Sequence, residues 1–198
     1  MKRGSFLAGL LCAGLLLTGC GGRFSPEITG VSVDKKGKVT QVVRENFQEA
    51  NYSEADLSQQ IKSAVDNYNA GQGDKRVKAG ELTVKSGVAQ LRIHYETASD
   101  YEKFNHVGFY VGQITGAIQQ GYAFEGSFVK VKAGKAEPEN KVWGSSLMTG
   151  TNYKTVVFEE PMLVEVPGEI RYVSENLNVT GKSTAVAEEN GVSYILYE

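Results

Sequence analysis

The first twenty residues differ in composition from the rest of the chain, and they limit what can take part in the fold. Lys2 and Arg3 give this segment a positive end, and residues 6–17 form an apolar run interrupted by two glycines. Twelve residues with a helical rise of about 1.5 Å each span about 18 Å, well short of the roughly 30 Å hydrocarbon core. The pattern predicts a cleavable signal peptide over residues 1–19 and disfavours a permanent transmembrane helix.

The apolar run ends in the motif Leu17-Thr18-Gly19-Cys20. Behind a positive end and a short apolar run, this motif resembles the lipobox of bacterial lipoproteins with a type II signal peptide. The resemblance covers the first 20 residues and implies that Cys20 becomes the first residue of the mature protein, its thiol carrying diacylglycerol with acyl chains such as palmitate. Two or three such chains hold a protein firmly in a bilayer. The alternative is an ordinary secretory signal with an incidental cysteine, but no small-x-small cleavage site follows within reach.

The resemblance also predicts where the protein resides. It implies a lipid-anchored protein on the extracytoplasmic face of the cell membrane or in the cell envelope. Because Gly21 is not aspartate, a Gram-negative cell would tend to send such a lipoprotein to its outer membrane. A Gram-positive cell would leave it on the outer face of its only membrane, and both hosts stay open. The body is similar in general appearance to small lipoproteins of Gram-positive bacteria, although no motif in it identifies a family.

Charge and cysteine content exclude several classes of function. When residues 1–19 are removed, Lys2 and Arg3 leave with them and no acidic residue does, so the formal net charge changes from −2 to about −4. No basic run exceeds two residues, which disfavours nucleic-acid binding and a polybasic membrane-surface role. Cys12 lies in the removed segment and Cys20 carries lipid, which excludes a disulfide, thiolate catalysis and a cysteine metal site in the body.

The mature chain has the length of one domain. With 41 % hydrophobic residues and ten tyrosines, it has the composition of a packed globule. Residues 20–27 are predicted to be the lipidated cysteine and a short tether, which holds the body roughly 10–20 Å from the bilayer. Residues 28–198 are predicted to form a single globular α+β domain.

Two hairpins are predicted near the start of this domain. Residues 31–47 alternate around a polar turn that ends in Gly37, a residue suited to a left-handed backbone conformation. Residues 82–95 alternate around Ser86-Gly87, a two-residue loop that keeps the apolar side chains of both strands on one face.

Helices are predicted between and after the hairpins. Residues 53–69 form the strongest one, because Ser53 and Asp56 make a capping-box-like start and apolar residues recur at spacings of three and four. A short helix is predicted to begin at Ser99, and a further helical stretch is predicted over residues 110–120.

The remainder of the chain favours strands. A polar stretch over residues 133–152 is predicted to be a long loop. Strands are predicted over residues 128–132, 153–158, 162–166, 169–174, 183–187 and 192–197. The order of elements indicates the α+β class, with a mainly antiparallel sheet or sheets and two to three helices packed on one face.

Trp143 and Tyr153 are the candidate binding residues. Trp143 is the only tryptophan, and it stands in a stretch otherwise rich in Gly, Lys, Asn and Glu. A lone aromatic residue on a polar loop can be a ligand platform or an interface anchor. It can also fold back as a plug over the core. Tyr153 could belong to the same patch.

Other motifs carry weaker signals. Residues 180–184 resemble the end of a phosphate-binding loop, but the earlier glycine is missing and a strand follows, so a polar turn is predicted. Gly108, Gly112 and Gly116 repeat every four residues and predict one face of a helix packed close against a neighbour, with a partner interface as the alternative.

The titratable residues form no catalytic or metal-binding pattern. His94 and His106 have no pre-aligned spacing for a metal ion. No serine stands in a nucleophile elbow, and the adjacent acidic pairs diverge along strands or turns. No metal or other cofactor, and no catalytic residue, is therefore predicted.

Two hypotheses for function follow. The first is a membrane-anchored extracytoplasmic lipoprotein, non-enzymatic, whose domain binds a small ligand or an envelope partner and leaves Trp143 exposed. The alternative is an envelope hydrolase or transferase, whose site forms only in the fold around His94, His106 or Glu96 with a convergent carboxylate. A purely structural role in an envelope assembly is a third possibility.

Overall fold

The computed structural model describes residues 24–47, 53–148 and 152–198. The predicted signal peptide and Cys20 lie outside the described residues. The first sheet contains β1 (Gly30–Val33), β2 (Val39–Asn46), β3 (Val77–Ala79), β4 (Thr83–Lys85), β5 (Val88–Tyr95), β10 (Leu163–Glu165), β12 (Leu177–Val179) and β13 (Thr184–Ala187). The second sheet contains β6 (Phe109–Gln113), β7 (Ser127–Lys132), β8 (Lys135–Trp143), β9 (Lys154–Phe158), β11 (Ile170–Ser174) and β14 (Ser193–Tyr197). The described helices are α1 (Glu54–Gln72), α2 (Ala98–Asn105), α3 (Ile114–Gln119) and α4 (Gly144–Leu147).

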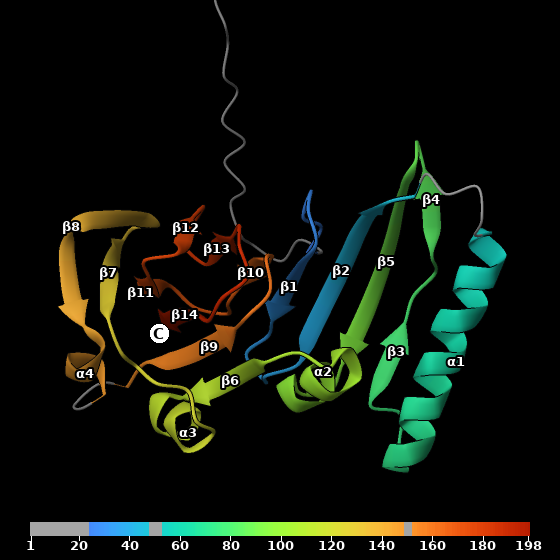
Figure 1. Ribbon diagram of the computed structural model, residues 1–198, viewed down its shortest axis with the longest axis horizontal. Coiled ribbons are helices and arrows are strands. Elements are labelled where there is room, and N and C mark those ends of the chain that lie inside the picture. Colours follow the sequence, from blue (N-terminus) through green and yellow to red (C-terminus); the bar gives the residue numbers. More distant parts are fainter. Residues whose placement is uncertain (1–23, 48–52, 149–151) are drawn as a thin grey trace, which may run out of the picture.

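The two sheets are mainly antiparallel, which confirms this part of the predicted fold class. Strands of the first sheet follow the order β12-β13-β10-β1-β2-β5-β3, with β4 also paired to β5. Strands of the second sheet follow the order β6-β9-β14-β11-β7-β8. The pairing of β1 with β10 is parallel. Because β10 comes late in the chain, this pairing joins the N-terminal hairpin to the C-terminal strands (Figure 1).

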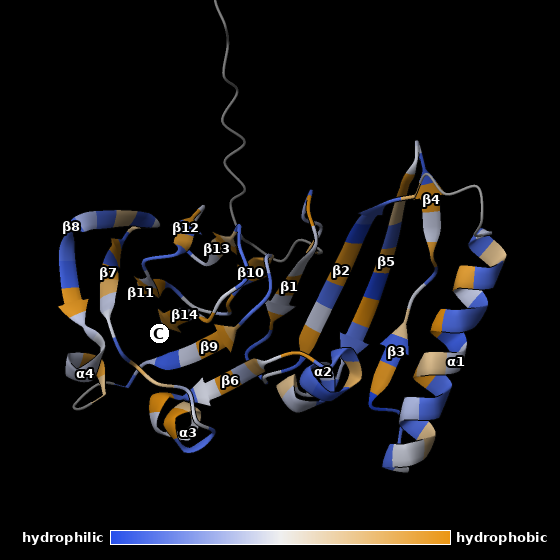
Figure 2. Ribbon diagram, in the orientation of Figure 1, coloured by the Kyte–Doolittle hydropathy of each residue, from blue (hydrophilic) through white to orange (hydrophobic). Residues whose placement is uncertain are grey.

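The main core lies between the two sheets. Val31 on β1 and Val164 on β10 belong to the same buried cluster as Phe158 on β9 and Ile195 on β14, and all four side chains are fully buried. Along β5, hydrophobic and hydrophilic residues alternate (Figure 2), as expected for a strand with one face in the core. The C-terminal strands thus build the same core as the first hairpin.

The second sheet is covered on both faces. All five residues of β14 are buried. Ile195 and Tyr197 point into the main core, whereas Tyr194 and Leu196 point into a second cluster on the opposite face, against α3 and α4. A central strand that is covered on both faces has a nearly continuous hydrophobic sequence. This explains why the predicted strand over residues 192–197 is so apolar.

The helices do not form a layer on one face, so this part of the fold prediction is wrong. Helix α1 contacts β3, and α2 contacts β5 and β6, whereas α3 contacts β6 and β9, and α4 contacts β8. Helix α1 contributes a single buried residue, Val65. Two sheets packed on each other already bury most of the apolar surface, so the helices cover only what remains. Among the described helices, none is both long and apolar enough to span a membrane.

Both predicted hairpins and the first helix are confirmed. Ser53 caps α1 by accepting a hydrogen bond from the backbone N–H of Asp56 at 3.0 Å, and Gly73 ends the helix in a left-handed conformation. At the second hairpin, Ser86 and Gly87 have φ values of 51° and 75°. Two consecutive positive φ angles are what a tight two-residue hairpin loop requires. Helix α2 begins one residue earlier than predicted.

The helix predicted over residues 110–120 is wrong in its first half. Residues Phe109–Gln113 form β6, which pairs with β9, and the chain becomes helical only at Ile114. The three repeating glycines therefore do not share a helical face. A Cβ atom at either Gly112 or Gly116 would collide with the hydroxyl group of Tyr110. These glycines leave room for the tyrosine side chain.

The long loop predicted over residues 133–152 is also wrong, because Lys135–Trp143 forms the edge strand β8. The partner register jumps between Lys141 and Glu137, so residues 138–140 bulge out of the ladder around Pro138. Bulges and prolines are common in exposed edge strands, where they hinder pairing with a further strand. Because both faces of this edge are largely exposed, its sequence carries no apolar alternation that could have predicted it.

Candidate functional site

A groove separates α1 from the edge of the first sheet. The edge consists of β3 and β4, which pair with β5 in registers that differ by one residue, so the chain bulges at residues 80–82. The groove has a volume of about 500 Å³, within the range of small-ligand sites. Its apolar lining comes from Ile61 and Val65 on α1 and from Val77, Leu82 and Leu91 on the sheet side.

Charged residues surround the apolar floor of this groove. Lys62 and Asp66 on α1 pair with each other at 2.8 Å, one helical turn apart. Lys75, Lys78 and Glu81 border the groove on the sheet side. The groove therefore has charged groups of both signs at its rim, beside an apolar floor.

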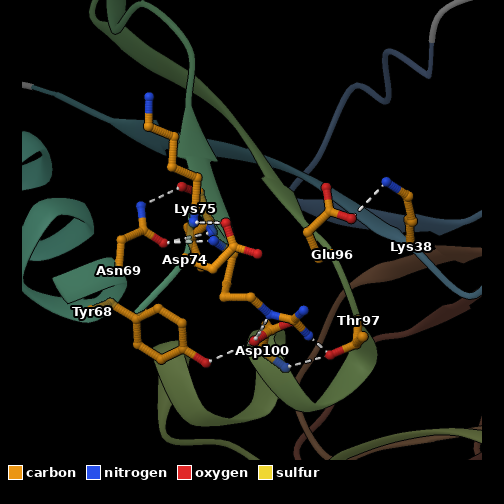
Figure 3. A network of polar contacts seen from close by, with 10 residues as sticks. Lys38, Tyr68, Asn69, Asp74, Lys75, Glu96, Thr97 and Asp100 are labelled. Carbon is orange, nitrogen blue, oxygen red and sulfur yellow. Dashed lines mark hydrogen bonds and ion pairs between the residues drawn. The ribbon is translucent and has the colours of Figure 1, made fainter. Parts of the chain in front are cut away.

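A buried carboxylate locks the C-terminal end of α1 at one end of the groove. Asp100 on α2 is 4 % exposed. Its oxygens accept hydrogen bonds from the Tyr68 hydroxyl at 3.1 Å, from Arg76 Nε and Nη2 at 3.2 and 2.9 Å, and from the Thr97 hydroxyl at 2.6 Å (Figure 3). The network joins α1, the segment before β3, and the start of α2.

The pKa values in this network follow from these contacts. Burial alone would raise the pKa of Asp100, but the hydrogen bonds from Thr97, Arg76 and Tyr68 outweigh it and lower the pKa of the carboxyl. Burial, followed by the hydrogen bond to Asp100, raises the pKa of Tyr68 to about 12. Asp100 is therefore ionised and Tyr68 neutral at neutral pH, the states in which the carboxylate accepts and the phenol donates.

Asn69 fastens α1 to β3 through backbone groups. Its amide nitrogen donates to the carbonyl oxygen of Val77 at 2.8 Å, and its amide oxygen accepts from the N–H groups of Arg76 and Val77 at 2.8 and 2.9 Å. These bonds satisfy backbone groups on the outer side of an edge strand. The C-terminal end of α1 is thus fixed to β3, and the middle of the helix, residues 58–69, forms one wall of the groove.

Trp143 is exposed and does not plug the core. Its exposed fraction is 67 %, and it is absent from both buried clusters. It stands at the end of the edge strand β8, directly before α4. An exposed indole at a sheet edge is available to a partner.

We expect iodide to quench the fluorescence of the folded protein strongly, because Trp143 is the only tryptophan in the chain and most of its surface is accessible. A titration with potassium iodide, on native and urea-denatured protein, measures this directly. The native protein should show most of the quenching seen after denaturation. Weak quenching that rises severalfold on unfolding would contradict the exposed position.

The structure does not bring Tyr153 and Trp143 together. Tyr153 packs edge-on against Tyr172, with ring centroids 5.8 Å apart, beside the second cluster. Val142 also packs on that cluster. Since neighbouring strand residues point to opposite faces, Trp143 points to the other face of the second sheet. The binding candidates from the sequence therefore do not form one patch.

The two histidines lie on the surface and apart from the groove. His94 is exposed on β5, with Nδ1 3.0 Å from the Thr40 hydroxyl, and His106 is an exposed C-cap of α2 with a φ of 57°. Glu96 pairs with Lys38 at 2.6 Å. None of these residues lines the groove. Over the described ranges, no cluster of three or more His, Cys, Asp or Glu side chains is placed to hold a metal ion.

Sequence reasoning missed the groove and the Asp100 network. Asp100 is visible in the sequence only as an acidic residue in the first turn of α2. Its partners Arg76 and Tyr68 are 24 and 32 residues away. Comparison of the chain with family models, curated proteins and solved structures gave no match. Function is therefore inferred from the side chains of this chain alone.

Proposed function

We propose that this protein is a lipid-anchored extracytoplasmic binding protein whose groove beside α1 takes a small ligand. The observation that carries the proposal is the groove of about 500 Å³ with an apolar floor and a charged rim. Binding sites are typically concave and mostly apolar, with a few polar groups that orient the ligand. The lipobox-like motif ending at Cys20 supports the anchor and the location.

The chemistry of the groove favours an amphipathic ligand with an anionic end. Ile61, Leu82 and Leu91 would contact the apolar body of such a ligand. Lys75 at the rim would attract the anionic group, because Lys62 is already paired with Asp66. Among the described residues of this lining, Ser58 carries the one hydroxyl, and Lys62, one helical turn from it, is paired with Asp66, which favours binding over catalysis.

Trp143 supports a second candidate function, the binding of an envelope protein. Its exposed indole stands at the open edge of the second sheet, on a strand interrupted by a bulge. Exposed aromatic residues often anchor protein interfaces. The alternative of an envelope hydrolase or transferase needs a histidine or glutamate beside a convergent carboxylate, and His94, His106 and Glu96 lie outside the groove.

The groove is tested with anilinonaphthalene sulfonate, a probe with an apolar ring system and one anionic group. We expect its fluorescence to rise and saturate with one probe per folded protein. Replacing Ile61 by aspartate adds a negative charge to the groove and removes an apolar contact. The probe should then bind about tenfold more weakly, since the contact of one large aliphatic side chain is worth roughly 1.5 kcal/mol or more.

The matched control places the same residue type on another exposed hydrophobic position. Val192 is 45 % exposed and does not line the groove, so Val192→Asp should leave probe affinity unchanged. Equal affinity of wild type and Ile61→Asp would contradict binding in the groove. Circular dichroism and the urea midpoint of each variant verify that its fold is intact.

A further inference from the structure

Several cationic side chains gather on the outer face of the first sheet, the face turned away from the main core. They are separated from one another in the sequence. On β5 the residues Ala89, Leu91 and Ile93 point into the core, so the alternate residues point outward. The cationic residues at the outward positions of the sheet are Arg44 on β2, Lys78 on β3, Lys85 on β4 and Arg92 on β5. The chain as a whole is acidic, with a net charge of −2.

Negative charge on this face is sparse. Glu165 on β10 points outward and accepts a hydrogen bond from the Ser32 hydroxyl at 3.0 Å. Glu188, directly after β13, also reaches this face, where it accepts from the amide nitrogen of Asn178 at 3.0 Å. Lys85 is exposed and Arg44 is half-buried. An acidic protein with one basic face is oriented by a negatively charged surface.

The N-terminal segment leaves the body from this same face. The guanidinium of Arg92 donates to the carbonyl oxygen of Phe24. Pro26 is buried. Val42 on β2 has no exposed surface, although it points outward. The hydrogen bond and the burial of Pro26 and Val42 agree with an N-terminal segment that crosses the outer face over β2 and β5.

The chain between the anchor and this face is short. Cys20 and Phe24 are four residues apart, so at most about 14 Å of extended chain joins them. A tether of this length keeps Cys20 within about 14 Å of Phe24, which Arg92 holds at the outer face of the first sheet.

We propose that the outer face of the first sheet lies against the anionic phospholipid headgroups of the membrane that holds Cys20. The proposal rests on the lipid anchor proposed above, and it adds an orientation: the basic face toward the bilayer, with α3 and α4 on the far side. Each lysine or arginine near an anionic bilayer strengthens association roughly fivefold. Four cations on one face of a tethered domain therefore favour this orientation strongly.

The test uses the lipidated full-length protein reconstituted into phosphatidylcholine vesicles with and without phosphatidylglycerol. A cysteine introduced at Thr83, which points outward on β4, takes a nitroxide label, and Lys132 on the opposite side of the molecule gives the control label. Collisions with a water-soluble nickel complex report the exposure of each label. Should Thr83→Cys perturb the fold, Thr184→Cys on β13 labels the same face.

We expect the Thr83 label to be protected only on vesicles that contain phosphatidylglycerol, and the Lys132 label to be exposed on both. Protection should disappear in 1 M salt, where the Debye length is about 3 Å. The double variant Arg44→Gln, Lys85→Gln should weaken docking about 25-fold, as two factors of five multiply. The charge-matched control Lys130→Gln, Lys135→Gln on the second sheet should not.

Each other outcome overturns a defined part of the proposal. Protein that does not float with the vesicles contradicts the lipid anchor itself. Protein that floats but leaves the Thr83 label as exposed as the Lys132 label contradicts the docking face while the anchor stands. Protection that is equal without phosphatidylglycerol, or that resists salt, contradicts headgroup recognition by charge. Protection of the Thr83 label by soluble polyphosphate, without protection by vesicles, would make the face a polyanion site rather than a membrane-docking face.

Discussion

Replacing Asp100 by asparagine is expected to lower the free energy of unfolding by about 2–3 kcal/mol, the range for buried hydrogen bonds to a charged group. Each carboxylate oxygen accepts two hydrogen bonds, one pair from Tyr68 and Arg76 and the other from Arg76 and Thr97. An amide keeps the shape but turns one acceptor into a donor, so two donors lose their partner. Urea unfolding followed by circular dichroism measures the change.

Asp66→Asn is the matched control for this prediction. Asp66 also pairs with a cation, Lys62, but both side chains are more than half exposed. Exposed pairs along a helix contribute little to stability. The urea midpoint of Asp66→Asn should therefore stay close to that of wild type. A loss as large as that of Asp100→Asn would contradict the special role of the buried network.

The same network predicts a dependence on pH. The contacts of Asp100 lower the pKa of its carboxyl in the folded state, while the unfolded chain has the ordinary value of about 3.9. Its contribution to stability is therefore complete above that value and is lost as the pH falls through the lower folded pKa. The stability difference between wild type and Asp100→Asn should be constant near neutral pH and shrink in acid. A difference that persists unchanged to acid would contradict the ionised state of Asp100.

The elements that the sequence predicted correctly are those whose signals lie within a few residues of one another. Helix α1 carries its own cap at Ser53, and the second hairpin carries its turn at Ser86-Gly87. Both were predictable because cap and turn depend on residues within a few positions of one another. The strands with one face in the core were predictable for the same reason, since their alternation follows the pleat.

Elements set by tertiary pairing were not predictable. The apolar residues in Phe109–Gln113 and in the segment that follows recur at helical spacing. The segment Phe109–Gln113 is nevertheless a strand, because it pairs with β9. Edge strand β8 is largely exposed on both faces and contains a proline, so it resembles a loop in sequence. Strand propensity depends strongly on context, and here the neighbouring strand decides the conformation.

The candidate sites depend on assembly even more strongly. The groove needs α1 and the bulged edge around residues 80–82, which only the paired sheet brings together. The basic outer face takes one cation from each of four strands, so no run of basic residues in the sequence indicates it. Exposure of Trp143, in contrast, agrees with its polar surroundings in the sequence.

Replacing Cys20 by alanine is expected to abolish stable membrane association, the largest effect predicted for any substitution in the chain. Each buried methylene of an acyl chain contributes about 0.8 kcal/mol, so the loss of two or three chains leaves only weak electrostatic contact. Cell fractionation in high salt measures the change. Cys12→Ala is the matched control, because Cys12 lies within the apolar run of the predicted signal peptide, and this variant should remain with the membrane.

The mass of the purified mature protein tests the lipid anchor most directly. A chain that begins at Cys20 and carries diacylglycerol on its sulfur, with radiolabelled palmitate incorporated in growing cells, is the predicted result. A chain that begins elsewhere, or a Cys20 that retains a free thiol, would contradict the anchor and with it the proposed location of the binding protein.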